Sequence, residues 1–480
     1  SVDITHNGTG IYCGGNYHGG LVVNHTSQNS EKINFEQNSW GIFAEAHSGT
    51  INVVRARMVN NGWAIYTFGN MVINDVNGAF NARGIVNDGG TVNFDSGSFY
   101  SSISDLKEYG IYNNSGTVNV RGGNVYNDNV GIFNAGTINM SAGAVGSCTT
   151  GIENNGTVNF TGGTLSGGTY GVQNSGNYTM SGGQITGYLT GVRNLANFNI
   201  SGGTINNNSV HGIVNEASNT FTGQIYMTGG NVTGNANYDI YHAKSDTDGA
   251  GAVYGGLRIE RNDTVNSKIL LAAYDNYIYT GNSTPQINSI TLGDVHLERL
   301  VIRSANTNHA QTMQNKVNVL NKGSYYCKAN ATNHSNYVVL WANYTVTTKH
   351  QTRDGKVLDT VTKTYEYKEN YTTEPKVIEG YVLSETPSNA RGTTSGNTTV
   401  IYYYEEDANV AVVNYKDLLS GIVSAKYWYN ANSENFSGNG TDFENGKVFE
   451  DYGFYKVVVT NGVGLQKELS FTLNKDSIKQ

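Results

Sequence analysis

Hydrophobic and polar positions alternate in short phrases that recur every 20 or 21 residues through the middle of the first half of the chain. The clearest phrase consists of a small residue, a β-branched residue, a variable residue and usually Asn. It begins at Gly110, Gly131, Gly151, Gly171, Gly191 and Gly212, with less regular copies at Gly10, Gly41, Ala64 and Gly84. Alternation between turn-forming residues predicts a short strand. A fixed period of this length predicts a repeat architecture.

Two further strand-like phrases complete each repeat. The second includes Thr117-Val-Asn-Val, Thr137-Ile-Asn-Met and Thr157-Val-Asn-Phe, and the third includes Gly122-Gly-Asn-Val and Gly162-Gly-Thr-Leu. Three strands per repeat form a triangular coil. When such coils stack, each strand pairs with the equivalent strand of the next coil, and the two strands are about 4.8 Å apart. We therefore expect an all-β chain that begins with a right-handed parallel β-helix of about 20 residues per coil.

The asparagine that ends the first phrase is expected to stabilise the corners of the coils. The β-branched residue beside it points inward, so the asparagine side chain lies where the chain turns, and its amide can bond to the coils above and below. We predict a structural ladder formed by Asn87, Asn113, Asn134, Asn154, Asn174, Asn194 and Asn215.

The repeat fades after about residue 232, although strand-like runs continue. Terminal repeats of solenoids are atypical because they cover an otherwise exposed edge. We therefore predict a solenoid of residues 1–342, with regular coils to about residue 232 and irregular capping coils over 233–342.

Composition excludes several classes of function. The 480 residues include 60 Gly but only 3 Pro, 14% are charged, and the net charge is −8. Without a run of Lys and Arg, or 18 consecutive apolar residues, we expect no nucleic-acid partner and no membrane insertion. Three cysteines, Cys13, Cys148 and Cys327, show no metal-ligand spacing, so we interpret them as incidental and predict no metal or cofactor.

Residues 343–406 differ in composition and read as alternating strands joined by turns. The phrases in order include Tyr344-Thr-Val-Thr-Thr-Lys, a hairpin at Asp354-Gly355, Tyr371-Thr-Thr-Glu-Pro-Lys and Thr399-Val-Ile-Tyr-Tyr-Tyr. This order resembles the mucin-binding (MucBP) repeat of Gram-positive surface proteins, although Lys368-Glu369-Asn370 replaces the usual Gly-containing turn. The resemblance implies a small β-grasp-like module on a wall-anchored adhesin.

Residues 407–480 form a third region with short alternating runs. Apolar and polar residues alternate in Ser424-Ala-Lys-Tyr-Trp-Tyr and in Gly453-Phe-Tyr-Lys-Val-Val-Val-Thr. Such alternation buries one face of each strand, which favours a β-sandwich. The second run is similar to the last hairpin of bacterial Ig-like repeats, so an Ig-like module is expected.

Parallel β-helices also carry polysaccharide lyases and hydrolases, whose chemistry needs clustered carboxylates. Asp128 and Glu153 are isolated acids in the regular coils. A richer group lies in a Gly-rich stretch and contains Asp246, Asp248, Glu260, Arg261 and Asp263. We interpret both sets as solvated side chains and predict no catalytic residue.

The variable position of the first phrase faces outward and is aromatic in most of the early copies. Such a row can offer platforms for sugar rings, or its rings can stack on one another or lie covered by inserts. We predict ligand binding by Tyr12, Phe43, Tyr66, Tyr112 and Phe133. The rows of Thr-x-Asn offer a different possibility, an ice-binding surface.

These patterns together predict a monomeric, non-catalytic adhesin on the surface of a Gram-positive bacterium. Its partners would be host glycans or mucin-like glycoproteins, bound through the solenoid, the MucBP-like module or both, and a wall-anchoring signal is expected beyond Gln480. The alternatives are a polysaccharide lyase or hydrolase on a β-helix scaffold, and an ice-binding or purely structural stalk protein.

Overall fold

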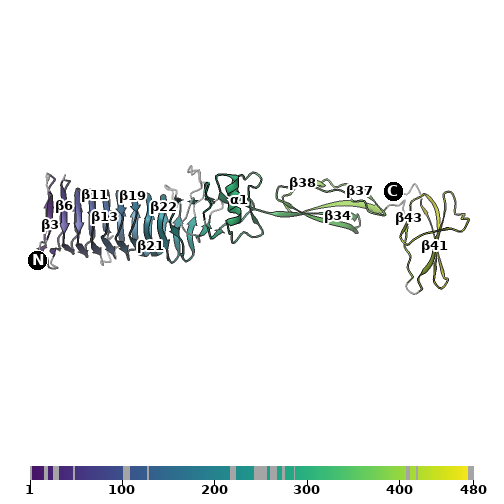
Figure 1. Cartoon of the computed structure of the whole chain (residues 1–480), viewed down its shortest axis with the longest axis horizontal. Helices are drawn as coiled ribbons and strands as arrows, with labels where there is room; N and C mark the ends of the chain where they lie inside the picture. Colours follow the sequence, from purple (N-terminus) through teal and green to yellow (C-terminus); the bar gives the residue numbers. More distant parts are fainter. Residues whose placement is uncertain are drawn as a thin grey trace. The chain divides into compact units, whose positions relative to one another are not determined.

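The computed structural model describes residues 3–15, 20–24, 32–46, 49–100, 109–126, 129–216, 223–242, 257–259, 267–272, 276–285, 287–406, 411–417 and 420–473. These residues are almost entirely β, with a single helix among them, which confirms the predicted all-β class (Figure 1). The chain divides into two compact units, Ser1–Trp341 and Ala342–Gln480.

The first unit is a parallel β-solenoid whose strands lie on three faces. The Gly-Ile-x-Asn phrase lies on the first face. Its strands are β2 (Thr9–Cys13), β5 (Trp40–Ala44), β8 (Trp63–Thr67), β11 (Arg83–Phe94), β13 (Tyr109–Val120), β15 (Val130–Asn134), β18 (Thr150–Asn154), β20 (Thr164–Asn174), β21 (Asn177–Asn194), β23 (His211–Asn215), β26 (Tyr238–His242), β28 (Lys268–Leu271) and β30 (Ser289–Leu292).

The Thr-x-Asn phrase lies on the second face. In addition to parts of β11, β13 and β21, this face contains β3 (Leu21–Asn24), β6 (Thr50–Val54), β9 (Asn70–Asn74), β16 (Thr137–Met140), β19 (Thr157–Phe160), β22 (Asn197–Asn206), β24 (Gln224–Met227), β27 (Leu257–Ile259), β29 (Ile278–Tyr279) and β31 (Leu300–Arg303).

The third face closes the triangle. It contains β1 (Asp3–Thr5), β4 (Ile33–Glu36), β7 (Ala56–Val59), β10 (Val76–Ala79), β12 (Gly97–Tyr100), β14 (Asn124–Tyr126), β17 (Ala144–Gly146) and β25 (Asn231–Val232), together with parts of β20, β21 and β22. The longest strands run around the corners and so belong to more than one face.

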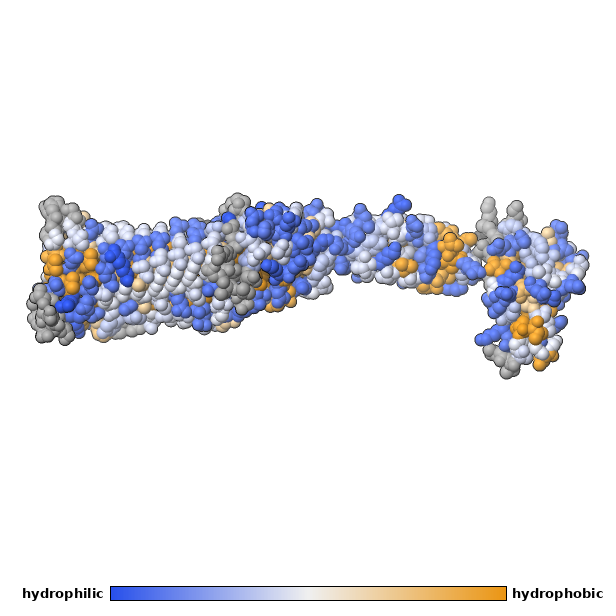
Figure 2. Space-filling model, viewed as in Figure 1, coloured by the Kyte–Doolittle hydropathy of each residue, from blue (hydrophilic) through white to orange (hydrophobic). Residues whose placement is uncertain are grey.

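One aliphatic core fills the solenoid. On the first face Ile111, Ile132 and Ile152 stand in register on consecutive coils, and each is fully buried. The side chains of neighbouring coils thus pack on one another along the whole length of the solenoid. On the visible side in Figure 2, the middle coils are mostly pale and show no broad hydrophobic patch, because their apolar side chains point inward.

Buried asparagines line one corner of the solenoid. The series is Asn87, Asn113, Asn134, Asn154, Asn174, Asn194 and Asn215. In the first six, the side-chain amide nitrogen donates to the side-chain oxygen of the asparagine one coil further on, at 2.7–2.9 Å, while the last, Asn215, donates to the carbonyl of Gly223; all seven are fully buried. Their amides also bond to backbone carbonyls at the corner, as Asn154 does to Asn177 at 3.1 Å.

A second corner holds shorter asparagine ladders that the sequence analysis did not include. Asn38 donates to Asn61, and Asn61 donates to Asn81, each at 3.0 Å. Further along, Asn208 donates to Asn235 at 2.8 Å. In the described coil just before Asn208 this position holds Tyr188, whose backbone N–H donates to the side-chain oxygen of Asn208 at 3.1 Å.

The solenoid ends in an antiparallel closure instead of a further parallel coil. Strand β33 (Tyr337–Trp341) pairs antiparallel with β31 and with β32 (Tyr326–Ala329). Helix α1 (Thr307–Lys316) precedes this hairpin, is capped by the side chain of Asn306, and buries Ala310 and Met313. The hairpin pairs the last parallel strand of the second face, whereas on the first face β30 is followed by a parallel bridge between Ile290 and Val319. The general expectation of a cap did not specify this closure.

The second unit begins with a module, the first β module, built on a mixed four-stranded sheet. Its order is β35 (Val357–Glu366), β34 (Asn343–Thr352), β39 (Thr398–Glu406) and β37 (Tyr381–Glu385), and β36 (Asn370–Thr372) pairs with β38 (Arg391–Thr393). Gly355 has a φ of +95° in the turn between β34 and β35. Val346, Tyr371, Val400, Tyr402 and Tyr404 form its core.

The second β module has two facing sets of strands, consistent with an Ig-like sandwich. One sheet has the order β42 (Thr441–Asp442), β41 (Ile422–Asn430), β44 (Gly453–Asn461) and β45 (Gln466–Leu473), and the other pairs β40 (Ala411–Val413) with β43 (Lys447–Phe449). Its core is separate and aromatic, including Phe443, Phe449 and Tyr455.

Candidate binding surface

The five aromatic residues of the predicted row lie on the outer side of the first face. Tyr12 pairs in register with Phe43, and Phe43 pairs with Tyr66 on the next coil. After one coil that carries Val86, Tyr112 pairs with Phe133. The inward alternation of the neighbouring isoleucines places these rings outward.

The rings stack on one another along the solenoid. The ring centroids of Tyr12 and Phe43 are 5.8 Å apart with an interplanar angle of 7°, those of Phe43 and Tyr66 are 5.3 Å apart, and those of Tyr112 and Phe133 are 4.7 Å apart at 13°. Because these separations are close to the coil spacing, each ring covers the face of its neighbour. The row therefore presents ring edges to solvent, and Tyr12, at the end of the row, is 59% exposed.

A second column of large side chains lies beside this row, at the residue just before the glycine of each phrase. The rings of Trp40 and Trp63 are 5.7 Å apart, Trp63 lies 5.1 Å from Tyr66, and Tyr109 lies 5.1 Å from Tyr112. The sequence analysis missed this column because it began each phrase at the glycine. We define the aromatic strip as both columns together: Tyr12, Trp40, Phe43, Trp63, Tyr66, Arg83, Tyr109, Tyr112 and Phe133.

Arg83 occupies the coil on which the row has Val86 in place of a ring. Its guanidinium carbon lies 4.5 Å from the ring centroid of Tyr112 and 5.6 Å from those of Trp63 and Tyr109. Strand register places Arg83 between Trp63 and Tyr109 on neighbouring coils. Cation–π attraction therefore bridges the two halves of the aromatic strip.

A carboxylate borders the strip at its first coil. The hydroxyl of Tyr12 donates to Oε1 of Glu45 at 2.5 Å, and the backbone N–H of Gly15 donates to Oε2 at 2.8 Å. The hydrogen bond from Tyr12 lowers the pKa of Glu45, and the same bond raises the pKa of Tyr12. Glu45 is thus held as an ionised acceptor beside an exposed ring.

A second carboxylate lies at the middle of the strip. Asp88 accepts from the hydroxyl of Tyr66 at 2.7 Å and from the side-chain amide of Asn114 at 2.6 Å. Ring edges, hydroxyls and carboxylates in alternation suit a ligand that is rich in hydroxyl groups.

The phenol of Tyr66 should lose its proton at a higher pH than an ordinary tyrosine does. Desolvation by burial, followed by the hydrogen bond to Asp88, raises the pKa of Tyr66 to about 12, against about 10 for an ordinary tyrosine. Since the folded pKa exceeds the unfolded one, the stability that this group contributes is present below pH 10 and is lost as pH rises toward 12.

The difference between the ultraviolet titrations of the protein and of Tyr66→Phe should therefore show one tyrosine with a midpoint near pH 12. Asp88→Asn should lower this midpoint, because the carboxylate is removed while burial remains. A midpoint near pH 10 in the unmodified protein would contradict the assignment.

The strip ends beyond Phe133. The next residues of the same column are Glu153, Gln173 and Arg193, and Arg193 forms an ion pair with Glu216 at 3.0 Å. The continuous series of stacked rings thus ends there, although Tyr238 and Tyr241 return to the same two columns on a later coil, where both contact the ring of His211.

The acidic residues weighed for catalysis fall into two sets. Asp128, Asp246, Asp248, Glu260, Arg261 and Asp263 lie outside the described residues. Glu153 is described, and its register partners are Phe133 and Gln173, so no acid stands beside it on either neighbouring coil. Within the described ranges, no group of three or more His, Cys, Asp and Glu side chains is placed to hold a metal ion.

The Thr-x-Asn rows lie on the second face, in register from Thr117 through Thr137 to Thr157. Their asparagines bond to one another, as Asn139 does to Asn119 at 2.8 Å. Part of their hydrogen-bonding capacity is therefore used within the sheet instead of being offered to a ligand.

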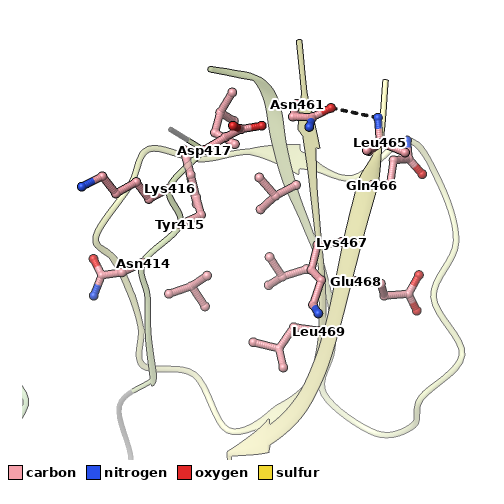
Figure 3. Close-up of a pocket in the computed structure, with 14 residues that line it drawn as sticks. Asn414, Tyr415, Lys416, Asp417, Asn461, Leu465, Gln466, Lys467, Glu468 and Leu469 are labelled. Atoms are coloured by element: carbon pink, nitrogen blue, oxygen red, sulfur yellow. Dashed lines mark hydrogen bonds between the residues drawn. The ribbon is translucent and has the colours of Figure 1, made fainter. Parts of the chain in front are cut away.

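The second β module contains a cavity of about 680 Å³ beside the β44–β45 hairpin (Figure 3). Val457, Val459 and Leu469 contribute apolar side chains, while Lys467 and Glu468 contribute charges. The first β module contains a smaller pocket of about 450 Å³ that is lined by Thr348 and the buried His350. Neither pocket was anticipated from the sequence, because each depends on packing between separate strands.

None of the three cysteines forms a disulfide. Cys13 and Cys148 are buried and Cys327 is half-buried, and burial raises the pKa of the Cys13 and Cys327 thiols. A raised pKa lowers the fraction of reactive thiolate.

Comparisons with known proteins match one family model and two curated relatives. Residues 345–405 match the model of the MucBP domain family. Over 53 residues the chain is 55% identical to Internalin J of Listeria monocytogenes serovar 1/2a (strain ATCC BAA-679 / EGD-e) and 49% identical to Internalin J of L. monocytogenes serotype 4b (strain F2365). Each alignment covers 10% of this chain and 6% of the relative, so the similarity concerns one module of much longer proteins. No helix in the described ranges is both long and apolar enough to cross a membrane.

Proposed function

We propose that this chain is the ligand-binding part of a non-catalytic adhesin on the surface of a Gram-positive bacterium, with mucin-type glycoproteins or other host glycans as its partners. The match of residues 345–405 to the MucBP domain carries this proposal. The similarity of 53 residues of the chain to Internalin J supports it.

The solenoid suits display of a binding surface. Each coil packs only on its neighbours, so a repeat array builds a long exposed surface from one simple unit. Within this surface the aromatic strip combines ring edges, phenol hydroxyls and carboxylates. We propose that Tyr12, Phe43, Tyr66, Tyr112 and Phe133 contribute to glycan contact through their edges.

Binding of the full chain to immobilised mucin tests the proposal. We expect the triple variant Tyr66→Ala, Tyr112→Ala, Phe133→Ala to weaken binding by about tenfold or more, because each buried ring contact contributes about 0.5–1.5 kcal/mol. Gln173→Ala, on the same column but beyond the strip, serves as the matched control.

Fragments 1–341 and 342–480 then separate the contributions, since the two units have separate hydrophobic cores. Binding by 342–480 alone, with an unaffected triple variant, would assign recognition to the small modules. Failure of the full chain to bind any mucin or host glycan would refute the adhesin proposal. Shortening of a plant polysaccharide during long incubation would favour the lyase or hydrolase alternative instead.

A further inference from the structure

Arg83 is the one cation of the aromatic strip, and its surroundings are unusual for an arginine. Three aromatic rings, those of Trp63, Tyr109 and Tyr112, lie within 5.6 Å of its guanidinium carbon. Among the described residues its side chain has no hydrogen-bond or ion-pair partner, although its backbone N–H donates to the carbonyl of Gly62 at 3.2 Å. The residue is half-buried.

The geometry of a guanidinium determines where its ligand can bind. The five N–H donors of a guanidinium lie in its plane, whereas an aromatic ring attracts the cation through the ring face. A ring face cannot satisfy in-plane donors, so these donors remain available along the rim. A planar acceptor with two oxygens is the best match for such a rim, because both oxygens can bond in parallel.

The nearby carboxylates do not supply this acceptor. Asp88 acts electrostatically on Tyr66 from one side, and Glu153 acts on Tyr109 from the other, but neither forms an ion pair with Arg83. Both oxygens of Asp88 already accept hydrogen bonds, from Tyr66 and from Asn114. The side-chain donors of Arg83 are therefore open to solvent or to a ligand.

We propose that Arg83 is the recognition point for a sugar that bears a carboxylate, held at the centre of the aromatic strip. The guanidinium pairs with the carboxylate in a bidentate way, and the edges of Trp63 and Tyr112 contact the apolar side of the sugar ring. Asp88 lies within reach of the same region and supplies an acceptor for sugar hydroxyls. This inference rests on the proposed function and names the ligand class for the solenoid.

Calorimetric titration of the full chain with 3′-sialyllactose, with its carboxamide derivative and with lactose tests this assignment. We expect 3′-sialyllactose to bind at least about tenfold more tightly than the two uncharged probes, as a charge-assisted pair requires. Arg83→Gln should abolish that preference. Arg83→Lys should keep part of this preference, because an ammonium group retains the positive charge but cannot form the two parallel hydrogen bonds of a guanidinium.

The control variant is Arg57→Gln, which removes an exposed arginine on the third face, whereas the strip lies on the first face. It should leave all three affinities unchanged. Thermal unfolding of each variant shows whether the solenoid stays folded, and Arg83→Lys keeps the test valid if Arg83→Gln does not. No binding of 3′-sialyllactose, equal binding of all three probes, or an unchanged preference in Arg83→Gln would each overturn the assignment.

The two proposals fail in different ways. If the chain binds mucin equally well before and after enzymatic removal of terminal acidic sugars, the role of Arg83 is wrong while the adhesin proposal stands. If 3′-sialyllactose binds at Arg83 but no mucin is retained, the site stands and the mucin-type partner is wrong.

Discussion

Asn154→Ala is expected to destabilise the solenoid by about 3 kcal/mol, a large change for a single side chain. Asn154 is fully buried. Its amide nitrogen donates to the side chain of Asn174 at 2.8 Å and to the carbonyl of Asn177 at 3.1 Å. Its oxygen accepts from Asn134 at 2.8 Å and from the backbone of Gly156 at 3.1 Å.

The cost is high because alanine leaves these partners in place without a replacement. A buried donor or acceptor that loses its partner has given up hydration and gains nothing in return, which costs about 1–3 kcal/mol per group. The loss should also be local to one corner, since each coil touches only its neighbours.

Denaturant unfolding of the 1–341 fragment, followed by circular dichroism, measures this loss. The control is Asn155→Ala, one residue further on, where the side chain is exposed and makes no hydrogen bond. That variant should stay within about 0.5 kcal/mol of the parent fragment. Equal stability of the two variants would show that the asparagine ladder contributes little to the fold.

Gly168→Ala is expected to destabilise the solenoid by more than about 3 kcal/mol. Gly168 has a φ of +125°, a conformation that side chains rarely adopt, and a Cβ there would lie 1.8 Å from the carbonyl oxygen of Cys148. Because the obstacle is backbone of the preceding coil, the clash can be relieved only by separating two coils. The hydrogen bonds from Thr169 and Tyr170 to Thr149 would be strained by that movement.

Gly167 serves as the control, because a side chain there meets an unfavourable backbone conformation without a steric clash. Gly167 has a φ of +78°, but the nearest atom to a Cβ there is 3.7 Å away. Gly167→Ala should therefore cost only about 1–2 kcal/mol, the penalty for a left-handed conformation alone. The same unfolding measurement on both variants tests this. A similar loss in the two would mean that contact with Cys148 does not control the position.

The strands and register of the regular part of the solenoid could be predicted from the sequence. From Gly110 to Asn215 the repeat length is almost constant, so residues that share a phrase position must stand above one another in the coils. Ile111, Ile132 and Ile152 accordingly lie in one buried column. The asparagines of the same phrase share a corner for the same reason.

The contacts between the early coils were harder to predict because the spacing between copies of the phrase varies. The phrase starts at Gly10, Gly41, Ala64, Gly84 and Gly110, with intervals of 31, 23, 20 and 26 residues. Inserts between coils change the length of a turn without changing which strands pair. Sequence offsets therefore do not show that Arg83 lies between Trp63 and Tyr109, whereas strand register does.

The orientation of the aromatic rings also required the tertiary structure. Alternation predicts that Tyr112 and Phe133 point outward, and nothing in the pattern distinguishes an open platform from a stack. The 4.7 Å between their centroids shows that each covers the other. The strip consequently offers a ligand the edges of its aromatic rings and the N–H groups of Arg83, instead of open ring faces.

The amino-acid sequence by itself determined that the chain is all-β, that it begins with a coiled repeat of parallel strands, and that small β modules follow, because these features depend on local alternation and on a constant period. Only the tertiary structure decided which side chains from different coils meet. Those contacts include the stacked rings, Arg83 among three aromatic neighbours, the second asparagine corner, and the closing hairpin of β32 and β33. They depend on the register between coils and on inserts of unequal length, and neither has a local signature in the chain.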